Sequence, residues 1–265
     1  MKRREFLGGS LAASAAAITG NTAIAQGKTG KAREYYELRR YHLQSGPQTK
    51  LMDAYLSEAL IPAMNRLGIK TVGAFSLTYG PETPSMYVLL PSMELETLVM
   101  SDQMLAKDEA FQKVAAPFWS APATAPAFLR AESKLMVAFE GWPKLVVPEA
   151  TQKKEKRIYQ MRTYESVTDS AHARKVEMMN SGETEAFRNS GCTQVFYGDT
   201  LIGPSMPNLT YMLSFPDLAA MDAGWSRFRV DPIWRKLSGS PRYNYEAIVS
   251  NIANLVLTPT DYSQI

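Results

Sequence analysis

Hydrophobic and polar positions along the chain follow two different periods, which predict the order of its strands and helices. Segments with apolar residues at every second position are typical of β-strands, and segments with apolar residues three and four positions apart are typical of helices. The first half of the chain follows the order strand, helix, strand, strand, helix, strand, with strands at 35–41, 71–77, 86–90 and 128–139. This order is the β-α-β-β-α-β pattern of a ferredoxin-like unit.

The two helices of this unit have recognisable ends. The first is predicted over 48–67, where Pro62 should kink or split it and Gly68 should end it as a C-cap glycine. The second should begin after Ser92, which is a suitable N-cap residue. An Ala- and Pro-rich stretch over 115–126 predicts a surface excursion before the last strand.

The same pattern returns in the second half of the chain. The segment YELRRY at 36–41 is followed by YQMRTY at 159–164, at an offset of 159 − 36 = 123 residues. The pairs that keep this offset are Gly68 and Gly191, Val72 and Val195, and the segments 108–111 and 231–234, while Tyr87 and Tyr211 are one residue further apart. Shared landmarks in one order at one spacing indicate an internal duplication.

We therefore predict an α+β fold built of two tandem ferredoxin-like units. The units span 34–139 and 157–258, and a linker over 140–156 joins them, with a charged run that is expected to be solvated. In the second unit, Asp217 should cap the second helix, and the last strand should cover 245–257.

The first 25 residues have the pattern of an export signal. A basic start at 2–4 precedes an apolar run, and Ala23-Ile24-Ala25 matches an A-x-A cleavage site. The segment RREFL at 3–7 matches the R-R-x-F-L core of a twin-arginine signal, although Lys2 and Gly8 depart from the usual pattern. The alternatives are a Sec signal or a lipid anchor, and the missing cysteine at the cleavage site disfavours the anchor. We expect 1–25 to be a twin-arginine signal peptide and the mature protein to be periplasmic or otherwise exported.

Charge and composition limit the classes of binding partner that the mature protein is expected to have. Removal of 1–25 takes three of the 29 basic and one of the 26 acidic residues, so the mature chain carries 26 against 25. Such a balance gives no electrostatic reason to bind nucleic acid. No later segment is apolar over eighteen residues, so no membrane partner is expected after cleavage, and a homo-oligomer stays open. Cys192 is the single cysteine, which excludes an intrachain disulfide.

The repeated strand at 36–41, the glycines Gly68 and Gly191, and the D-P-x-W segment at 231–234 together resemble the NIPSNAP family. The first copy departs from the D-P-x-W motif, because it has DEAF at 108–111. The resemblance covers nearly the whole mature chain, in two copies. It implies the dimeric α/β-barrel superfamily, in which two four-stranded sheets pack around a central cavity, and here an intrachain pseudo-dimeric α/β-barrel. That superfamily includes monooxygenases, haem-dependent chlorite dismutases and peroxidases, and members of no known activity, so the resemblance implies a fold and not a reaction.

Few residues are available for metal, haem or nucleophilic chemistry. His42 and His172 are the only histidines, they do not occupy equivalent positions in the two copies, and neither stands in a metal-binding spacing with Cys192. The one remaining candidate for a haem ligand is His172 as a lone axial ligand. A surface or capping role is favoured for this histidine. The chain contains no G-x-S-x-G and no phosphate-binding glycine loop. We expect no metal and no cofactor.

The better candidates come from alternation in the repeated strands. Arg39 and Tyr41 share one face, Arg162 and Tyr164 share the equivalent face, and the opposite face carries Leu38 and Met161. We expect the leucine and methionine to lie beneath the helices, and the arginines and tyrosines to lie in the cavity between the sheets. Two guanidiniums beside phenols could hold a carboxylate, phosphate or enolate. The alternative is structural, with Arg39 and Arg162 paired to Glu37 or other carboxylates so that they lock the two sheets together.

These observations predict a small-molecule site without naming its reaction. The leading hypothesis is an exported protein that binds a small anionic or aromatic ligand between its sheets. The alternatives are a cofactor-independent monooxygenase or isomerase, with Arg and Tyr stabilising an oxyanion, and a protein-interaction module without catalysis. Trp234 and Phe111, at equivalent places in the second helices, are expected to be core anchors, with Trp234 the more important for stability.

The export signal yields the first testable prediction. Replacement of Arg3 and Arg4 by lysine should leave uncleaved precursor in the cytoplasm, because the twin-arginine route distinguishes guanidinium from ammonium groups. Cell fractionation and the mass of the mature chain measure this. Undiminished export of the double-lysine form would assign the signal to the Sec route.

Overall fold

A computed structural model describes residues 32–44 and 46–265, so the expected signal peptide lies outside the described residues. The described part of the chain belongs to one compact unit. None of its helices combines the length and the apolar character that a membrane crossing requires.

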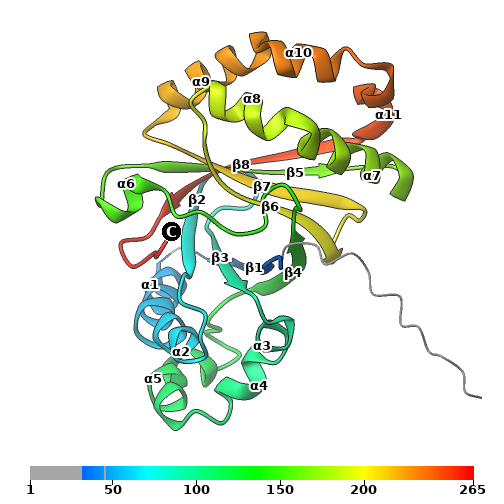
Figure 1. The fold of residues 1–265 in the computed structure, drawn as a ribbon. Helices are drawn as coiled ribbons and strands as arrows, with labels where there is room; N and C mark the ends of the chain where they lie inside the picture. The colour runs from blue at the N-terminus through cyan, green and yellow to red at the C-terminus, as the bar shows by residue number, and fades with distance from the viewer. Residues whose placement is uncertain (1–31, 45) are drawn as a thin grey trace, which may run out of the picture. The chain divides into compact units, whose positions relative to one another are not determined.

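One closed antiparallel barrel forms the centre of this unit (Figure 1). Around the barrel the strands follow the order β1-β3-β2-β8-β5-β7-β6-β4. Their bounds are β1 (Tyr35–His42), β2 (Gly73–Tyr79), β3 (Ser85–Ser92), β4 (Arg130–Ala138), β5 (Ile158–Glu165), β6 (Thr193–Ile202), β7 (Asn208–Phe215) and β8 (Asn251–Pro259).

The N-terminal half (32–139) and the C-terminal half (157–265) contribute four strands each, in the same local order. The first half gives β4-β1-β3-β2 and the second gives β8-β5-β7-β6. The register is also equivalent, because Arg39 lies opposite Val88 and Arg162 lies opposite Tyr211. Val88 and Tyr211 are 123 residues apart, so the structural partner of Tyr211 is Val88 and not Tyr87. The pairs β2–β8 and β4–β6 join the halves.

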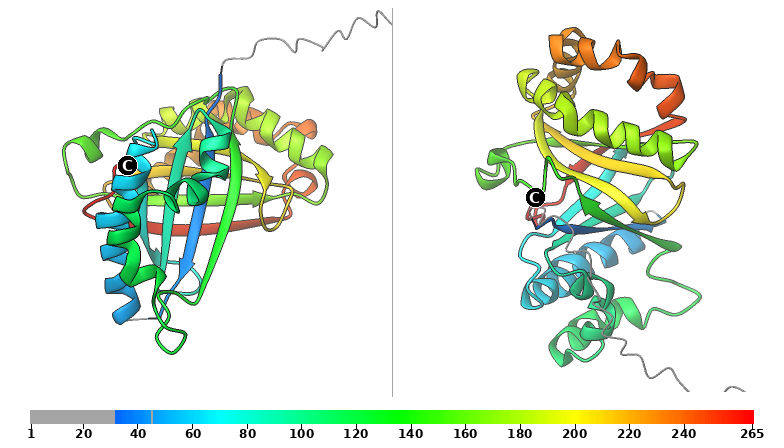
Figure 2. Two further views of the ribbon diagram at one scale, coloured as in Figure 1. Left: turned by 90° about the horizontal axis from the view of Figure 1, so that it is seen from below. Right: turned by 45° about the vertical axis from the view of Figure 1, so that its right-hand side comes forward.

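Helices cover the two opposite outer faces of the barrel, as Figures 1 and 2 show. Those of the N-terminal half are α1 (Pro47–Ala54), α2 (Ile61–Arg66), α3 (Leu95–Val99), α4 (Ser101–Leu105) and α5 (Glu109–Trp119). Those of the C-terminal half are α7 (Asp169–Met178), α8 (Thr184–Asn189), α9 (Leu218–Val230), α10 (Pro232–Ser238) and α11 (Tyr245–Ile248), with a 3₁₀ turn η3 (Pro241–Tyr243).

A π-helical segment interrupts the first helix of each half. It is η1 (Tyr55–Leu60) in the first half and η2 (Met179–Glu183) in the second. In the first half the following helix has Pro62 in its first turn, which confirms that the helix splits there. In the second half no proline is present, and Gly182 breaks the helical geometry with a φ of 140°. π-helical turns are frequent at functional sites.

The barrel interior is filled by side chains from both halves, among which Leu38 and Met161 are buried. Tyr41 instead packs with the helices of the first half, and Tyr164 with those of the second. The expected facing of the two repeated strands was therefore wrong, because Leu38 and Met161 face the interior. The other large interior side chains are Tyr36, Phe75, Tyr159, Phe196 and Met212.

Three predicted element boundaries also need correction. Ser92 is the last residue of β3 and does not cap the next helix. The helix α5 continues through Pro117 into the expected surface excursion, because a proline in the last turn removes only one backbone hydrogen bond. The stretch expected to begin the last strand contains α11, and β8 starts at Asn251. Asp217 does cap α9, as predicted.

The segment between the halves is held by the barrel and is not a free connector. It contains α6 (Glu149–Gln152). The Leu145 amide donates to a carboxylate oxygen of Glu34 at 2.6 Å, and the Val146 amide donates to the Val195 carbonyl at 2.9 Å. The segment is therefore fixed to strands of the second half as well as to the start of the first.

One end of the barrel interior is polar and contains a half-buried lysine. Lys134 reaches from β4 to β7, where its Nζ donates to Asn208 Oδ1 at 3.2 Å and Thr210 Oγ1 at 3.1 Å. Burial lowers the pKa of Lys134 to about 8, and the charge of Glu165 opposes this shift.

This lysine predicts a pH dependence of stability. Its folded pKa lies below the unfolded value of 10.5, so between these two pH values the unfolded chain binds more protons than the folded one. The charged lysine therefore destabilises the fold at low pH, and this destabilisation fades as pH rises above about 8. The free energy of unfolding of Lys134→Met should exceed that of the wild type most near pH 7, and the difference should shrink towards pH 9.5. Urea denaturation at both pH values measures this, and parallel pH profiles would contradict it.

The second helices predict a difference between their two aromatic residues. Asp108 and Asp231 cap α5 and α10 through backbone N–H groups of Phe111 and of Ile233 and Trp234. Phe111 is 3% exposed, whereas Trp234 is only partly buried. Phe111→Ala should lower the free energy of unfolding by about 3–5 kcal/mol, as for other core aromatics. Trp234→Ala should lower it less, which reverses the order expected from sequence.

Candidate functional site

A pocket of about 400 Å³ lies between the sheet and the helices of the C-terminal half. This volume is in the range of small-molecule sites. The pocket lies on the outer face of β5, beneath α9 and α10, and not between the two sheets where a cavity was expected. Its lining residues are Gln160, Arg162, Tyr164, Glu183, Trp225, Phe228, Arg229, Trp234, Tyr245 and Asn254.

Arg162 is the cation at the floor of the pocket. Its guanidinium carbon lies 4.3 Å from the ring centre of Trp225 and 5.2 Å from that of Tyr164. Among the described residues it has no carboxylate partner, and its Nε is buried without a hydrogen bond. A buried donor without a partner is uncommon in folded proteins, so a ligand that accepts its hydrogen bonds would satisfy it.

Trp225 is held over the arginine by a chain of amide hydrogen bonds. Its indole N–H donates to Gln160 Oε1 at 2.6 Å, and Gln160 Nε2 donates to Asn254 Oδ1 at 2.9 Å. Gln160 is 2% exposed, so its amide cannot rotate freely to other partners. The chain fixes the indole plane with neutral groups and adds no negative charge beside Arg162. The Glu183 carboxylate, which also lines the pocket, is paired with Lys175.

Tyr164, which lines the pocket, is paired with a second phenol behind it. The hydroxyls of Tyr164 and Tyr211 lie 3.0 Å apart and both side chains are buried. Burial raises the pKa of Tyr164 well above its usual value, and the Arg162 charge only partly opposes this. Burial likewise raises the pKa of Tyr211. Both phenols are therefore neutral hydrogen-bonding groups near pH 7.

The remaining charges at the pocket are a buried ion pair and a rim arginine. Lys175 and Glu183 are each 1% exposed, and Lys175 Nζ lies 2.6 Å from Glu183 Oε2. Lys175 Nζ also lies 5.0 Å from the ring centre of Tyr164. Arg229 is exposed at the rim.

At the equivalent place in the N-terminal half, two carboxylates neutralise the charge of the arginine. Arg39, the counterpart of Arg162, donates to both oxygens of Glu37 and lies 3.0 Å from Asp102. Its Nη2 also donates to the Ser101 hydroxyl at 2.9 Å. At the same offset the second half has Gln160 in place of the glutamate and Trp225 in place of the aspartate. Two carboxylates beside one arginine thus correspond in position to two neutral groups beside the other.

Aromatic packing also fills the N-terminal counterpart. Tyr55 stacks on Phe118 with ring centres 3.9 Å apart, and Phe118 stacks on Phe128 at 5.7 Å. Tyr41 packs edge-on against the latter two rings. Arg39 therefore has the predicted ion pair with Glu37, but together with Asp102 this pairing joins β1 to α4 and does not lock the two sheets together. Among the described residues Arg162 has no such ion pair.

The four residues predicted from sequence do not form one site. Arg39 and Tyr41 lie under the helices of the first half, and Arg162 and Tyr164 lie under those of the second. The barrel between them is filled. Only the second pair lines the pocket, joined by residues that sequence reasoning did not select. The missed residues are Gln160, Lys175, Glu183 and Trp225; comparing the two copies position by position would have marked them.

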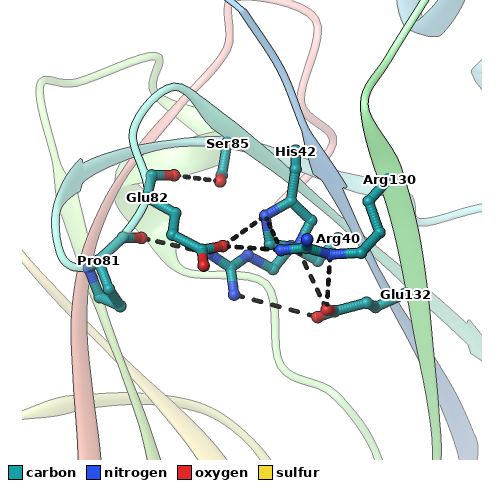
Figure 3. Close-up of polar contacts among 7 residues, drawn as sticks. All are labelled: Arg40, His42, Pro81, Glu82, Ser85, Arg130 and Glu132. Atoms are coloured by element: carbon teal, nitrogen blue, oxygen red, sulfur yellow. Dashed lines mark hydrogen bonds and ion pairs between the residues drawn. The ribbon is translucent and has the colours of Figure 1, made fainter.

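Both histidines lie close to carboxylates. His42 lies between Glu82 and Glu132 at the end of the barrel, at 2.6 and 3.3 Å, where Arg40 and Arg130 share the same carboxylates (Figure 3). His172 Nε2 lies 2.6 Å from Asp199. Within the described residues no group of three or more His, Cys, Asp or Glu side chains is arranged to hold a metal ion.

A closed antiparallel barrel with helices on both outer faces is the architecture of the dimeric α/β-barrel class. Solved structures of this kind agree. A protein of Fusobacterium nucleatum subsp. nucleatum, described provisionally as a monooxygenase, is 9% identical with a TM-score of 0.55, over 86% of this chain and 93% of that chain. A protein of Lactobacillus acidophilus with the same description is 6% identical with a TM-score of 0.55, over 86% and 94%. An anthrone oxidase-like protein is 11% identical with a TM-score of 0.50, over 87% and 93%.

The family comparison is more specific. Residues 159–264 match the model of the NIPSNAP family. The match is limited to the C-terminal half, where it supports the resemblance to the NIPSNAP family. No curated protein matches the chain.

Proposed function

We propose that the C-terminal half binds a planar aromatic compound that carries an anionic oxygen, in the pocket floored by Arg162. The observation that carries this proposal is the difference between the halves. Arg39 is neutralised by Glu37 and Asp102, whereas Arg162 has no carboxylate partner and is surrounded by aromatic rings.

The chemistry of the lining supports this class of ligand. A guanidinium forms charge-assisted hydrogen bonds with a carboxylate, phenolate or enolate oxygen. The rings of Trp225, Phe228 and Trp234 offer flat apolar surface for an aromatic body. Arg229 at the rim adds positive charge along the way in, which favours an anion.

We further propose that the barrel arose by tandem duplication of a ferredoxin-like unit, and that its halves have since specialised. The equal strand order, the offset of 123 residues and the π-helical segment at the same place in both halves support this. The N-terminal half then acts as the structural partner that closes the barrel. Its neutralised arginine and stacked rings are consistent with the loss of a binding role.

A cofactor-independent monooxygenase or isomerase is the second candidate. Arg162 can stabilise an oxyanion that develops on a bound ligand, and the Tyr164–Tyr211 pair can donate a hydrogen bond to it. Proteins of similar fold are described provisionally as monooxygenases.

We also propose a periplasmic or otherwise exported location for the mature protein. The pattern of an export signal over 1–25 supports this location.

A binding experiment tests the proposed site. The planar anion 2-naphthoate should quench tryptophan fluorescence, because Trp225 and Trp234 line the pocket. Arg162→Met should weaken this binding about 10- to 100-fold, since a hydrogen bond to a charged group is worth about 1.5–3 kcal/mol. Gln160→Glu should weaken it too, because it places beside Arg162 the carboxylate that Glu37 places beside Arg39.

A matched control removes an arginine elsewhere. Arg66 is exposed and forms a surface pair with Asp108, so Arg66→Met should leave the affinity for 2-naphthoate unchanged. Equal affinity of the wild type and Arg162→Met would show that the anion is held by other groups and would refute this site.

A further inference from the structure

The pocket contains a second group with no counterpart in the other half, and it faces the position of the ligand. Resting on the proposed function, we propose that Glu183 is the proton acceptor of this site. The site then takes aromatic ketones with an acidic C–H beside the carbonyl and converts them to their enolates. The enolate oxygen is the anion that Arg162 holds.

The Lys175–Glu183 pair is not needed to build the helix layer. At the offset of 123 residues, Lys175 corresponds to Met52 and Glu183 to Leu60, and both of these are fully buried. The same two helical positions are thus apolar in the half whose arginine is neutralised. A buried ion pair is often no more stabilising than apolar residues of similar size, so its presence calls for a reason other than stability.

The backbone brings Glu183 to the pocket by a local departure from helical geometry. Glu183 ends the π-helical segment η2, directly after Gly182 with its φ of 140°. A Cβ atom at Gly182 would lie 2.9 Å from Ile233 Cγ2, so only glycine allows α10 to pack this closely. This glycine therefore permits both the bend and the wall formed by α10.

Lys175 holds one carboxylate oxygen and leaves the other available. Its ammonium binds Glu183 Oε2, and in residues 32–44 and 46–265 no hydrogen bond reaches Oε1. The ammonium is itself held between the rings of Tyr164, at 5.0 Å, and Trp234, at 5.9 Å. Lys175 is a positioning residue, because it fixes the carboxylate without touching the ligand.

The proton transfer balances without a further reagent. Glu183 takes the proton from the carbon beside the carbonyl, the C–H electron pair forms the C=C bond, and the carbonyl π electrons move to oxygen. The negative charge passes from the carboxylate to the enolate oxygen, which Arg162 faces. Return of a proton from Glu183 regenerates the ketone, and if the acid has exchanged with D₂O, the ketone gains deuterium.

Deuterium exchange of a model ketone tests this step. The probe is 2-tetralone, a bicyclic aromatic ketone, in D₂O buffer, with loss of its acidic C–H signals followed by proton NMR. The wild type should accelerate exchange above buffer, and 2-naphthoate should inhibit it. Glu183→Gln should lower the enzymic rate by about 100-fold or more, the lower end of the contribution of general base catalysis.

A double variant covers the case in which Glu183→Gln leaves Lys175 unpaired and unfolds the chain. The double variant Lys175→Met, Glu183→Leu has the two apolar residues found in the N-terminal half, so it should fold. Its tryptophan fluorescence should still be quenched by 2-naphthoate, but it should not accelerate the deuterium exchange of 2-tetralone. Glu149→Gln, at a fully exposed carboxylate of α6, should exchange like the wild type.

The outcomes separate the two proposals. Binding of 2-naphthoate without accelerated exchange in the wild type, or full exchange by the double variant, overturns the role of Glu183 and leaves the binding site standing. Failure of 2-naphthoate to bind the wild type refutes the proposed function itself.

Discussion

Closure of two four-stranded sheets into one barrel is the constraint on which the rest of the structure depends. The pairs β2–β8 and β4–β6 join the halves edge to edge, so no strand in the barrel is left without neighbours. The interior is then shared, and Tyr36 and Phe196 from different halves pack 5.1 Å apart within it. These side chains pack together in the interior, and the pocket floored by Arg162 lies elsewhere, between a sheet and its own helices.

The two helix layers solve the same packing problem with different chemistry. In the N-terminal half, charge is balanced locally by Glu37 and Asp102 around Arg39, and stacked rings occupy the remaining volume. In the C-terminal half, amides and an indole surround Arg162 and a pocket remains. One backbone plan therefore supports a closed layer and an open one, and the difference lies in a few side chains.

Electrostatics explains why this difference matters for function. A guanidinium already bound to two carboxylates gains little from a third anion, whereas one surrounded by neutral groups in a partly buried place attracts it strongly. The Lys175–Glu183 pair balances itself and adds no net charge to the pocket. The net positive charge of the pocket therefore rests on Arg162 and, at the rim, on Arg229.

The sequence by itself determined the order of elements, the offset between the halves and several helix ends. Gly68 follows the end of α2 with a φ of 95°, and Asp217 caps α9, because these are local demands of the backbone. It also predicted that Arg39 and Arg162 stand at equivalent places, and that one structural role for them is a salt bridge.

Only the tertiary structure decided which face of each strand points inward and which arginine has a partner. Alternation assigns the residues of a strand to two faces but does not show which face points inward. Here both faces are covered, since β3 is buried over 85–91 and β7 over its whole length. Hydrophobicity therefore could not distinguish the interior from the helix side. Asp102 beside Arg39 and Trp225 beside Arg162 come from helices about sixty residues away in sequence, and only the folded chain brings them together.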